Sequence, residues 1–211
     1  MMIAKKVAEK LLQINAVKLS PQNPFTWASG IKSPIYCDNR LTLSFPDVRQ
    51  YIVKSFVKKS GQFEPFDIVA GVATAGIPHG VLLADRLKKP FIYVREKAKS
   101  HGRQNQIEGV LTVGSRVLII EDLISTGGSS IKAVEAVREA GGIVVGVLAI
   151  FSYGFDKAHQ VFKEADCPFD TLSNYDTLIS QAIENQYVKP EELNTLTAWR
   201  HSPETWGVNN F

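Results

Sequence analysis

The sequence predicts an α/β fold in which a parallel β-sheet is flanked by helices. Two strand–loop–helix units, at residues 67–87 and 117–140, support this prediction. In the second unit, residues 117–120 are four apolar residues in a row, which is typical of a strand buried on both faces of a parallel sheet. Strands that alternate with helices along a chain form parallel sheets, so the class follows from the order of elements.

Length and composition indicate a single domain. The chain has 211 residues, 45% of them hydrophobic, which is enough for a full core. The net charge of +3 is too small to indicate nucleic acid as the main partner. No apolar run reaches 18 residues, so no membrane span is expected. Cys37 and Cys167 lack metal-ligand spacing, and we interpret them as reduced cytosolic thiols rather than a disulfide. We therefore expect a cytoplasmic protein.

The N-terminal segment combines a helix with a turn-rich region. Residues 2–17 carry apolar side chains at helical spacing, which predicts a helix that covers another part of the molecule. Residues 20–40 are rich in Pro, Asn and Ser. Ser29 and Gly30 give a turn signal between two short runs that contain aromatic residues, so we expect a hairpin or a lid there.

Apolar periodicity assigns the remaining elements. Helices are predicted at residues 46–60, 81–87, 131–140, 156–165, 175–185 and 190–199, and strands at 67–71, 91–94, 117–120, 143–151 and 169–172. Residues 95–114 are polar, charged and without clear periodicity, and loops of that length are usually functional or mobile. The C-terminal residues Trp199, Arg200, His201 and Trp206 are expected to pack a terminal helix and to carry no chemistry.

The segment from residue 117 to residue 130 carries the clearest chemical signal. Glu121 and Asp122 follow the apolar run, and a loop of Ser, Thr and Gly comes next, immediately before a helix. Ligands of open α/β sheets bind at such strand ends, and backbone N–H groups at a helix start suit a phosphate. The acids suit hydroxyls or a metal, whereas a solvated turn is the alternative. Neither the lysine of a Walker loop nor a dinucleotide fingerprint is present, so a phosphorylated ribose fits best.

Three further segments are candidates for chemistry. Residues 95–109 hold four cations and His101 within a long loop, which could neutralise a diphosphate leaving group or be a solvated charged loop. Residues 70–80 form a glycine-containing strand-to-helix turn, which could bind a ligand through its backbone or be a plain turn. In residues 25–40, Phe25 or Tyr36 could stack on a flat ring, or the hairpin could pack on the core.

Residues 117–130, VLIIEDLISTGGSS, resemble the substrate signature of type I phosphoribosyltransferases. The resemblance implies the type I phosphoribosyltransferase fold, with a small N-terminal hood over the sheet. It implies that Glu121 and Asp122 hold the ribose hydroxyls and that the following loop holds the ribose phosphate. The implied substrate-binding stretch continues through Leu123, Ile124, Ser125, Thr126, Gly127, Gly128 and Ser129.

The other segments are similar to members of this family that use orotate. Residues 99–109 resemble their catalytic loop, which implies that Arg95, Lys99 and His101 contact the diphosphate across a dimer interface. Ala73 and Thr74 match a loop that presents backbone N–H groups to the leaving group, often through a cis peptide bond. Residues 25–40 resemble the hood that surrounds the pyrimidine, which implies substrate contacts at Ser29, Gly30 and Tyr36. The chain departs from some relatives at Ala28, Ala75 and Glu96, where they carry basic residues.

The resemblance implies a magnesium-dependent transfer of the phosphoribosyl group from phosphoribosyl diphosphate to orotate, in pyrimidine biosynthesis. Lys99, His101 and Asp122 would be catalytic, no residue is assigned as a metal ligand, and a homodimer would share its active sites. The implied layout is one domain at 1–211, with a hood at about 1–40 and the C-terminal helices, a core at about 45–172 and a mobile loop at about 95–110. A purine phosphoribosyltransferase is the nearer alternative. A regulatory protein that senses phosphoribosyl diphosphate and binds nucleic acid is the other, and the low charge argues against it.

Overall fold

The computed structural model describes residues 2–27, 29–96 and 106–206. Its centre is a six-stranded sheet in the order β10-β9-β8-β5-β6-β7, in which every pair is parallel except β6 and β7. The strands are β5 (Ile68–Val72), β6 (Phe91–Val94), β7 (Ile107–Glu108), β8 (Arg116–Ile124), β9 (Ile143–Ser152) and β10 (Phe169–Asn174). The predicted α/β class, with a mostly parallel sheet flanked by helices, is therefore confirmed.

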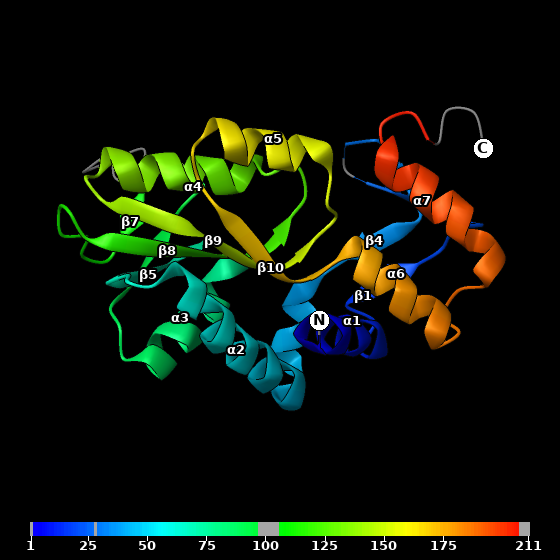
Figure 1. Ribbon diagram of the computed structural model, residues 1–211, viewed down its shortest axis with the longest axis horizontal. Helices are drawn as coiled ribbons and strands as arrows, with labels where there is room; N and C mark the ends of the chain where they lie inside the picture. The colour runs from blue at the N-terminus through cyan, green and yellow to red at the C-terminus, as the bar shows by residue number, and fades with distance from the viewer. Residues whose placement is uncertain (1, 28, 97–105, 207–211) are drawn as a thin grey trace.

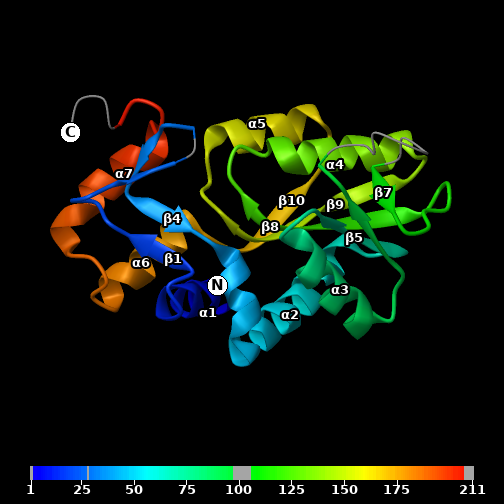
Figure 2. The same ribbon diagram turned by 180° about the vertical axis from the view of Figure 1, so that it is seen from behind.

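Helices cover both faces of this sheet (Figures 1 and 2). α4 (Gly128–Glu139) and α5 (Asp156–Glu164) lie on one face. On the other face lie α1 (Met2–Gln13), α2 (Pro46–Ser60) and α3 (Gly76–Leu87). A helix that follows a strand runs back along one face of the sheet, so that the next strand can start at the same end and run parallel to it.

The apolar run of β8 supplies both halves of the core. Leu118 and Ile120 join a cluster with α1, α2 and α3, whereas Val117 and Ile119 join a cluster with α4 and α5. All four side chains are fully buried. Because successive side chains of a strand point to opposite faces, a strand covered on both sides must be apolar at every position.

The N-terminal and C-terminal segments form a second body beside the sheet, which we call the hood (Figure 1). It contains the antiparallel pair β1 and β4 and the hairpin of β2 and β3, with α6 and α7 against them. The bounds are β1 (Val17–Leu19), β2 (Phe25–Thr26), β3 (Lys32–Ser33), β4 (Ile35–Cys37), α6 (Tyr175–Glu184) and α7 (Leu193–His201). The short 3-10 helices are η1 (Asn39–Ser44), η2 (Gly61–Phe63) and η3 (Pro190–Glu192).

Trp199 is the centre of an aromatic cluster that joins the hood to the sheet. Its ring lies 5.7 Å from that of Trp27, 5.6 Å from that of Tyr153 and 5.4 Å from that of Phe155, measured between centroids. The Trp199 side chain is fully buried, and its indole N–H donates to the Lys32 carbonyl at 3.2 Å. The expectation that Trp199 packs the terminal helix is confirmed.

Several element boundaries differ from the sequence predictions. The first helix ends at Gln13 rather than at residue 17, because Asn15 adopts a positive φ of 55° and the chain turns into β1. α3 begins at Gly76 rather than at residue 81, since a proline is tolerated in the first turn of a helix and Pro78 lies there. The loop predicted at residues 95–114 contains β7, which pairs with β6. The last predicted helix is divided into η3 and α7.

The predicted end of β8 at residue 120 is wrong in an informative way. The strand continues to Ile124, because β9 extends to Ser152 and pairs with it there, Leu123 opposite Phe151 and Ile124 opposite Ser152. The acid pair therefore lies inside a paired strand. Within the described ranges of the chain, no helix is long and apolar enough to cross a membrane.

Candidate active site

The candidate site lies at the carboxyl ends of β5 and β8, the neighbouring strands at the middle of the sheet. After β8, residues 125–127 form a short turn, the β8 loop, and α4 begins at Gly128. Gly127 has a φ of 86°, a left-handed conformation that a glycine adopts without steric cost. A Cβ on Gly127 would also lie 2.8 Å from the Val161 side chain, so α5 packs closely against this turn. The N–H groups at the start of α4 are thereby left facing the end of the sheet, where an anion can accept from them.

Glu121 is held by the start of α4. Its side chain is only 5% exposed, and one carboxyl oxygen accepts from the Asp122 backbone N–H at 3.0 Å. The other oxygen accepts from the hydroxyls of Ser129 and Ser130 at 3.5 and 3.4 Å. Burial raises the pKa of Glu121 well above its usual range, and the charge of Asp122 raises it further. Glu121 thus connects the strand to the helix that follows the β8 loop.

Asp122 lies on the other side of the strand, because consecutive residues of a strand point to opposite faces. Its carboxyl is less buried than that of Glu121. Burial raises the pKa of Asp122, although the nearby guanidinium of Arg40 acts in the opposite direction. Its backbone carbonyl accepts from the Asn39 side-chain amide at 2.8 Å, which ties η1 to the strand. The two acids therefore have different surroundings, and Asp122 is the one nearer the hood.

The loop after β5, residues 73–75, which we call the β5 loop, lies beside the first turn of α4. The Ala73–Thr74 peptide bond is cis, as the resemblance to the phosphoribosyltransferases implies. A cavity of about 220 Å³ lies between the two segments. Its lining includes Ala73, Arg95, Gly128, Ser129 and Lys132. The Arg95 guanidinium is 3.5 Å from the Glu108 carboxylate, and this ion pair holds the arginine just after the end of β6. The structure thus brings Ala73, Arg95, Gly128 and Ser129, which the sequence indicated separately, to one place.

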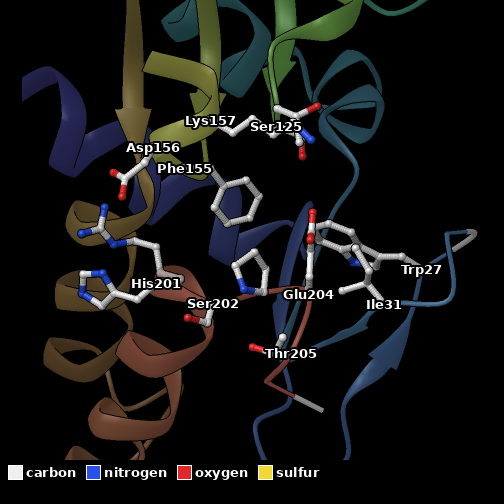
Figure 3. A pocket seen from close by; sticks show the side chains of 13 residues that line it. Trp27, Ile31, Ser125, Phe155, Asp156, Lys157, His201, Ser202, Glu204 and Thr205 are labelled. Atoms are coloured by element: carbon white, nitrogen blue, oxygen red, sulfur yellow. The ribbon is translucent and has the colours of Figure 1, made fainter. Parts of the chain in front are cut away.

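A second cavity, of about 320 Å³, lies between the β8 loop and the hood (Figure 3). Ser125 and Thr126 line it from the β8 loop, and Trp27 and Ile31 line it from the hairpin. The first residues of α5 and the C-terminal segment complete it, through Phe155, Asp156, Lys157, Arg200, His201, Ser202, Pro203, Glu204 and Thr205. Arg200 and His201, which we expected to pack the terminal helix and to carry no chemistry, both border this cavity.

Some predicted residues lie elsewhere. Ser29 and Gly30 are exposed at the tip of the hairpin and line neither cavity. Tyr36 is 43% exposed, and its ring centroid is 5.8 Å from that of Phe25. Leu123 and Ile124 contribute their side chains to the core, so only their backbones can face a ligand.

Two predicted residues are not placed by the structure. Lys99 and His101 lie outside the described residues.

Sequence reasoning missed Lys157 and the C-terminal wall of the larger cavity. A signal for Lys157 did exist in the order of elements. α5 starts at the carboxyl end of β9, the neighbour of β8, so its first turn belongs to the same edge of the sheet. The C-terminal wall has no comparable signal, because nothing local in residues 200–205 indicates that they return to this edge.

Comparison with known proteins agrees with this geometry. Residues 45–187 match the family model of the phosphoribosyl transferase domain. The orotate phosphoribosyltransferase of Listeria innocua is 58% identical over 208 residues, which cover 98% of this chain and all of that protein. The fold and the pair of strand-end loops define a phosphoribosyltransferase. The chain belongs to this family and, within it, to the orotate phosphoribosyltransferases.

Solved structures of that group have the same fold. The orotate phosphoribosyltransferase of Aeropyrum pernix superposes with a TM-score of 0.76 at 28% identity, over 87% of this chain and 99% of that one. The UMP synthase of Leishmania donovani gives a TM-score of 0.79 at 26% identity, over 93% of this chain and 42% of that longer one. The predicted type I phosphoribosyltransferase fold is confirmed.

Proposed function

We propose that this protein transfers the 5-phosphoribosyl group from phosphoribosyl diphosphate to orotate, giving orotidine 5'-monophosphate and diphosphate, in pyrimidine biosynthesis. The observation that carries the proposal is the juxtaposition of the β5 loop and the start of α4 around one cavity. A substrate that carries a phosphate and a diphosphate on one ribose needs two such anion sites side by side. The identification of orotate as the accepting base is supported by the similarity to orotate phosphoribosyltransferases.

The reaction needs no nucleophile from the protein. A ring nitrogen of orotate forms a bond to the anomeric carbon as the bond to diphosphate breaks, and positive charge develops on the ribose. The N–H groups and hydroxyls at residues 125–129 hold the 5-phosphate, and the β5 loop with Arg95 holds the diphosphate. Asp122 lies beside the ribose, where its charge favours the developing cation. Loss of one such contact commonly costs on the order of 3 kcal/mol, or about a hundredfold in rate.

Magnesium is part of the proposal. Within residues 2–27, 29–96 and 106–206, no group of three or more His, Cys, Asp or Glu side chains could hold a metal ion. Magnesium commonly binds through one or two carboxylates together with substrate phosphates, and Asp122, the less buried of the two acids, fits that donor set. When bound, the ion would neutralise charge on the diphosphate.

The assembly and the location complete the proposal. Lys99 and His101 of one subunit act on the diphosphate in the active site of the other subunit of a homodimer. Both cysteines are free in the structure, which agrees with the reducing conditions of the cytoplasm, where we place the enzyme.

The decisive experiment follows the absorbance of orotate in the presence of phosphoribosyl diphosphate and magnesium. We expect the absorbance to fall, and we expect a chelator to stop the reaction until magnesium is restored. Turnover of adenine or hypoxanthine in place of orotate would contradict the proposed base while keeping the family. Turnover that continues in excess chelator would contradict the role of magnesium.

A further inference from the structure

We propose that Lys157 is a further substrate-binding residue, whose ammonium group neutralises the 5-phosphate held by the β8 loop. This inference rests on the proposed function and adds to it a side chain on a neighbouring helix. The resemblance to the family assigned the phosphate to residues 125–129, and none of those residues carries a positive charge.

The position of Lys157 is the first argument. It is the second residue of α5 and lines the larger cavity together with Ser125 and Thr126. Figure 3 shows its side chain extending along the cavity toward Ser125. Among the residues that the structure describes, none forms a hydrogen bond or an ion pair with its ammonium group. A phosphate seated against the β8 loop would therefore meet a cation that has no competing partner there.

The electrostatics of α5 give a second argument. The N-terminal end of a helix carries a partial positive charge, so a lysine in the first turn is unfavourable and an acidic residue is favourable. Asp156 follows that rule, whereas Lys157 does not. Figure 3 shows Asp156 on the far side of Phe155 from Ser125, so the two neighbours point in different directions. The helix alone therefore does not explain a cation at position 157. A phosphate bound beside the first turn of α5 would explain it.

Charge balance in the cavity gives the third argument. A phosphate monoester brings nearly two negative charges near pH 7, and the carboxylate of Asp156 lines the same cavity. Glu204 also lines the cavity and adds a further carboxylate. Arg200 borders the same space, but its guanidinium donates to the Gly154 carbonyl at 3.2 Å and lies 3.4 Å from Asp176. Among the described residues that line this cavity, Lys157 is the one lysine, and its ammonium group is available to offset the phosphate charge.

The test compares ligands that differ only in the phosphate. Calorimetric titrations with orotidine 5'-monophosphate, ribose 5-phosphate and orotidine are made on the wild type and on Lys157→Gln. The matched control is Lys163→Gln, which removes an exposed lysine from the last turn of the same helix. We expect Lys157→Gln to weaken both phosphorylated ligands about tenfold, the loss typical of one charge-assisted hydrogen bond, and to leave orotidine unchanged. Lys163→Gln should change none of the three.

A defect in folding would be recognised separately. Removal of a cation from the first turn of α5 should leave the melting temperature unchanged or slightly higher, and Lys157→Arg should restore most of the affinity for the phosphorylated ligands. Equal weakening of orotidine, or unchanged binding of both phosphorylated ligands, would overturn the role of Lys157. A wild type that binds ribose 5-phosphate but neither orotidine compound would instead contradict the choice of orotate, and the ribose 5-phosphate titration would still decide the role of Lys157.

Discussion

The side-chain amide of Asn39 donates a hydrogen bond to the backbone carbonyl of Asp122, at 2.8 Å between residues 83 positions apart in the sequence. Asn39 is 1% exposed and is the first residue of η1, which follows the hood strand β4. The Thr42 hydroxyl in turn donates to the Asn39 carbonyl. This bond therefore fixes the hood relative to the acid that we place beside the ribose.

Replacement of Asn39 by alanine tests this coupling. The change leaves the part-buried Asp122 carbonyl without this donor, so we expect a loss of about 1–3 kcal/mol in the free energy of unfolding and a fall in kcat/KM. The control is Asn185→Ala, because the Asn185 amide donates to the Gln181 carbonyl at the same 2.8 Å, away from the site. Urea denaturation and steady-state kinetics measure both. An equal loss of kcat/KM in the two variants would mean that Asn39 acts through stability alone.

The proposed homodimer with shared active sites predicts rescue in mixed dimers. Lys99→Ala removes a residue of the catalytic loop, and Asp122→Ala removes a residue of the strand-end site. If the loop acts in the partner subunit, a mixed dimer keeps one site with both residues intact. We expect each variant alone to be nearly inactive and the mixture to recover up to about a quarter of wild-type activity, a statistical estimate for random exchange. No recovery after confirmed subunit exchange would show that each subunit works alone.

The buried His79 predicts a pH dependence of stability. The residue is 1% exposed, and burial lowers its pKa to about 4. The unfolded chain binds a proton at this site below about pH 6.5, whereas the folded chain does so only near pH 4. His79 therefore contributes its full stability above pH 6.5 and loses about 3 kcal/mol as the pH falls from 6.5 to 4.

Urea denaturation of the wild type and of His79→Gln, at several values between pH 4 and 7, measures this contribution. We expect the difference between the two curves to change across the window, because glutamine does not titrate. The raised pKa of Glu121 acts on both proteins and cancels in that difference. Parallel curves would show that His79 titrates normally in the folded protein.

Asp122 predicts opposite effects on stability and on activity. Because burial raises its folded pKa, the ionised carboxylate destabilises the folded state, and this cost grows as the pH rises above the unfolded pKa near 4. Asp122→Asn should therefore be more stable than the wild type at pH 7, although its kcat should fall about a hundredfold. At Asp67, the guanidinium of Arg116 lowers the carboxyl pKa, so Asp67→Asn should not stabilise the protein. A destabilised but fully active Asp122→Asn would contradict the assignment.

The start of α3 has room only for a glycine at position 76. A Cβ there would clash with the Ile120 carbonyl, because the helix passes directly over β8. Gly76→Ala should cost on the order of 3 kcal/mol and disturb the β5 loop that precedes the helix. Gly61→Ala is the matched control, since no atom lies within 4 Å of a Cβ at that position and its backbone is right-handed helical. That control should stabilise the protein by about 0.4–1 kcal/mol, and equal melting temperatures for the two variants would contradict the clash.

Local pattern predicted most of the sheet and its helices. The run from Val117 to Ile120 is apolar because both faces of the strand are covered. This burial is visible in the sequence of the strand itself, so it could be predicted. The same holds for α2, whose predicted bounds agree with the structure. The end of β8 could not be predicted in this way, because pairing with the last residues of β9 decides it.

The candidate site shows the same division. The β8 loop was recognisable because its glycines and hydroxyls adjoin a strand and a helix. By contrast, Trp27 and Ile31 reach the β8 loop whereas Ser29 and Gly30 do not, and only the packing of the hood on Trp199 decides between them. Lys157 depends on the adjacency of β8 and β9, which is a tertiary relationship.

The aromatic cluster has a practical consequence for spectroscopy. The chain has three tryptophans, Trp27, Trp199 and Trp206, and none of them lies in the six strands of the sheet or in the helices α2 to α5. Intrinsic tryptophan emission therefore reports on the hood, whereas far-ultraviolet circular dichroism reports on the whole chain. Overlay of the two melting curves distinguishes a hood that opens before the sheet unfolds from a molecule that unfolds as one unit.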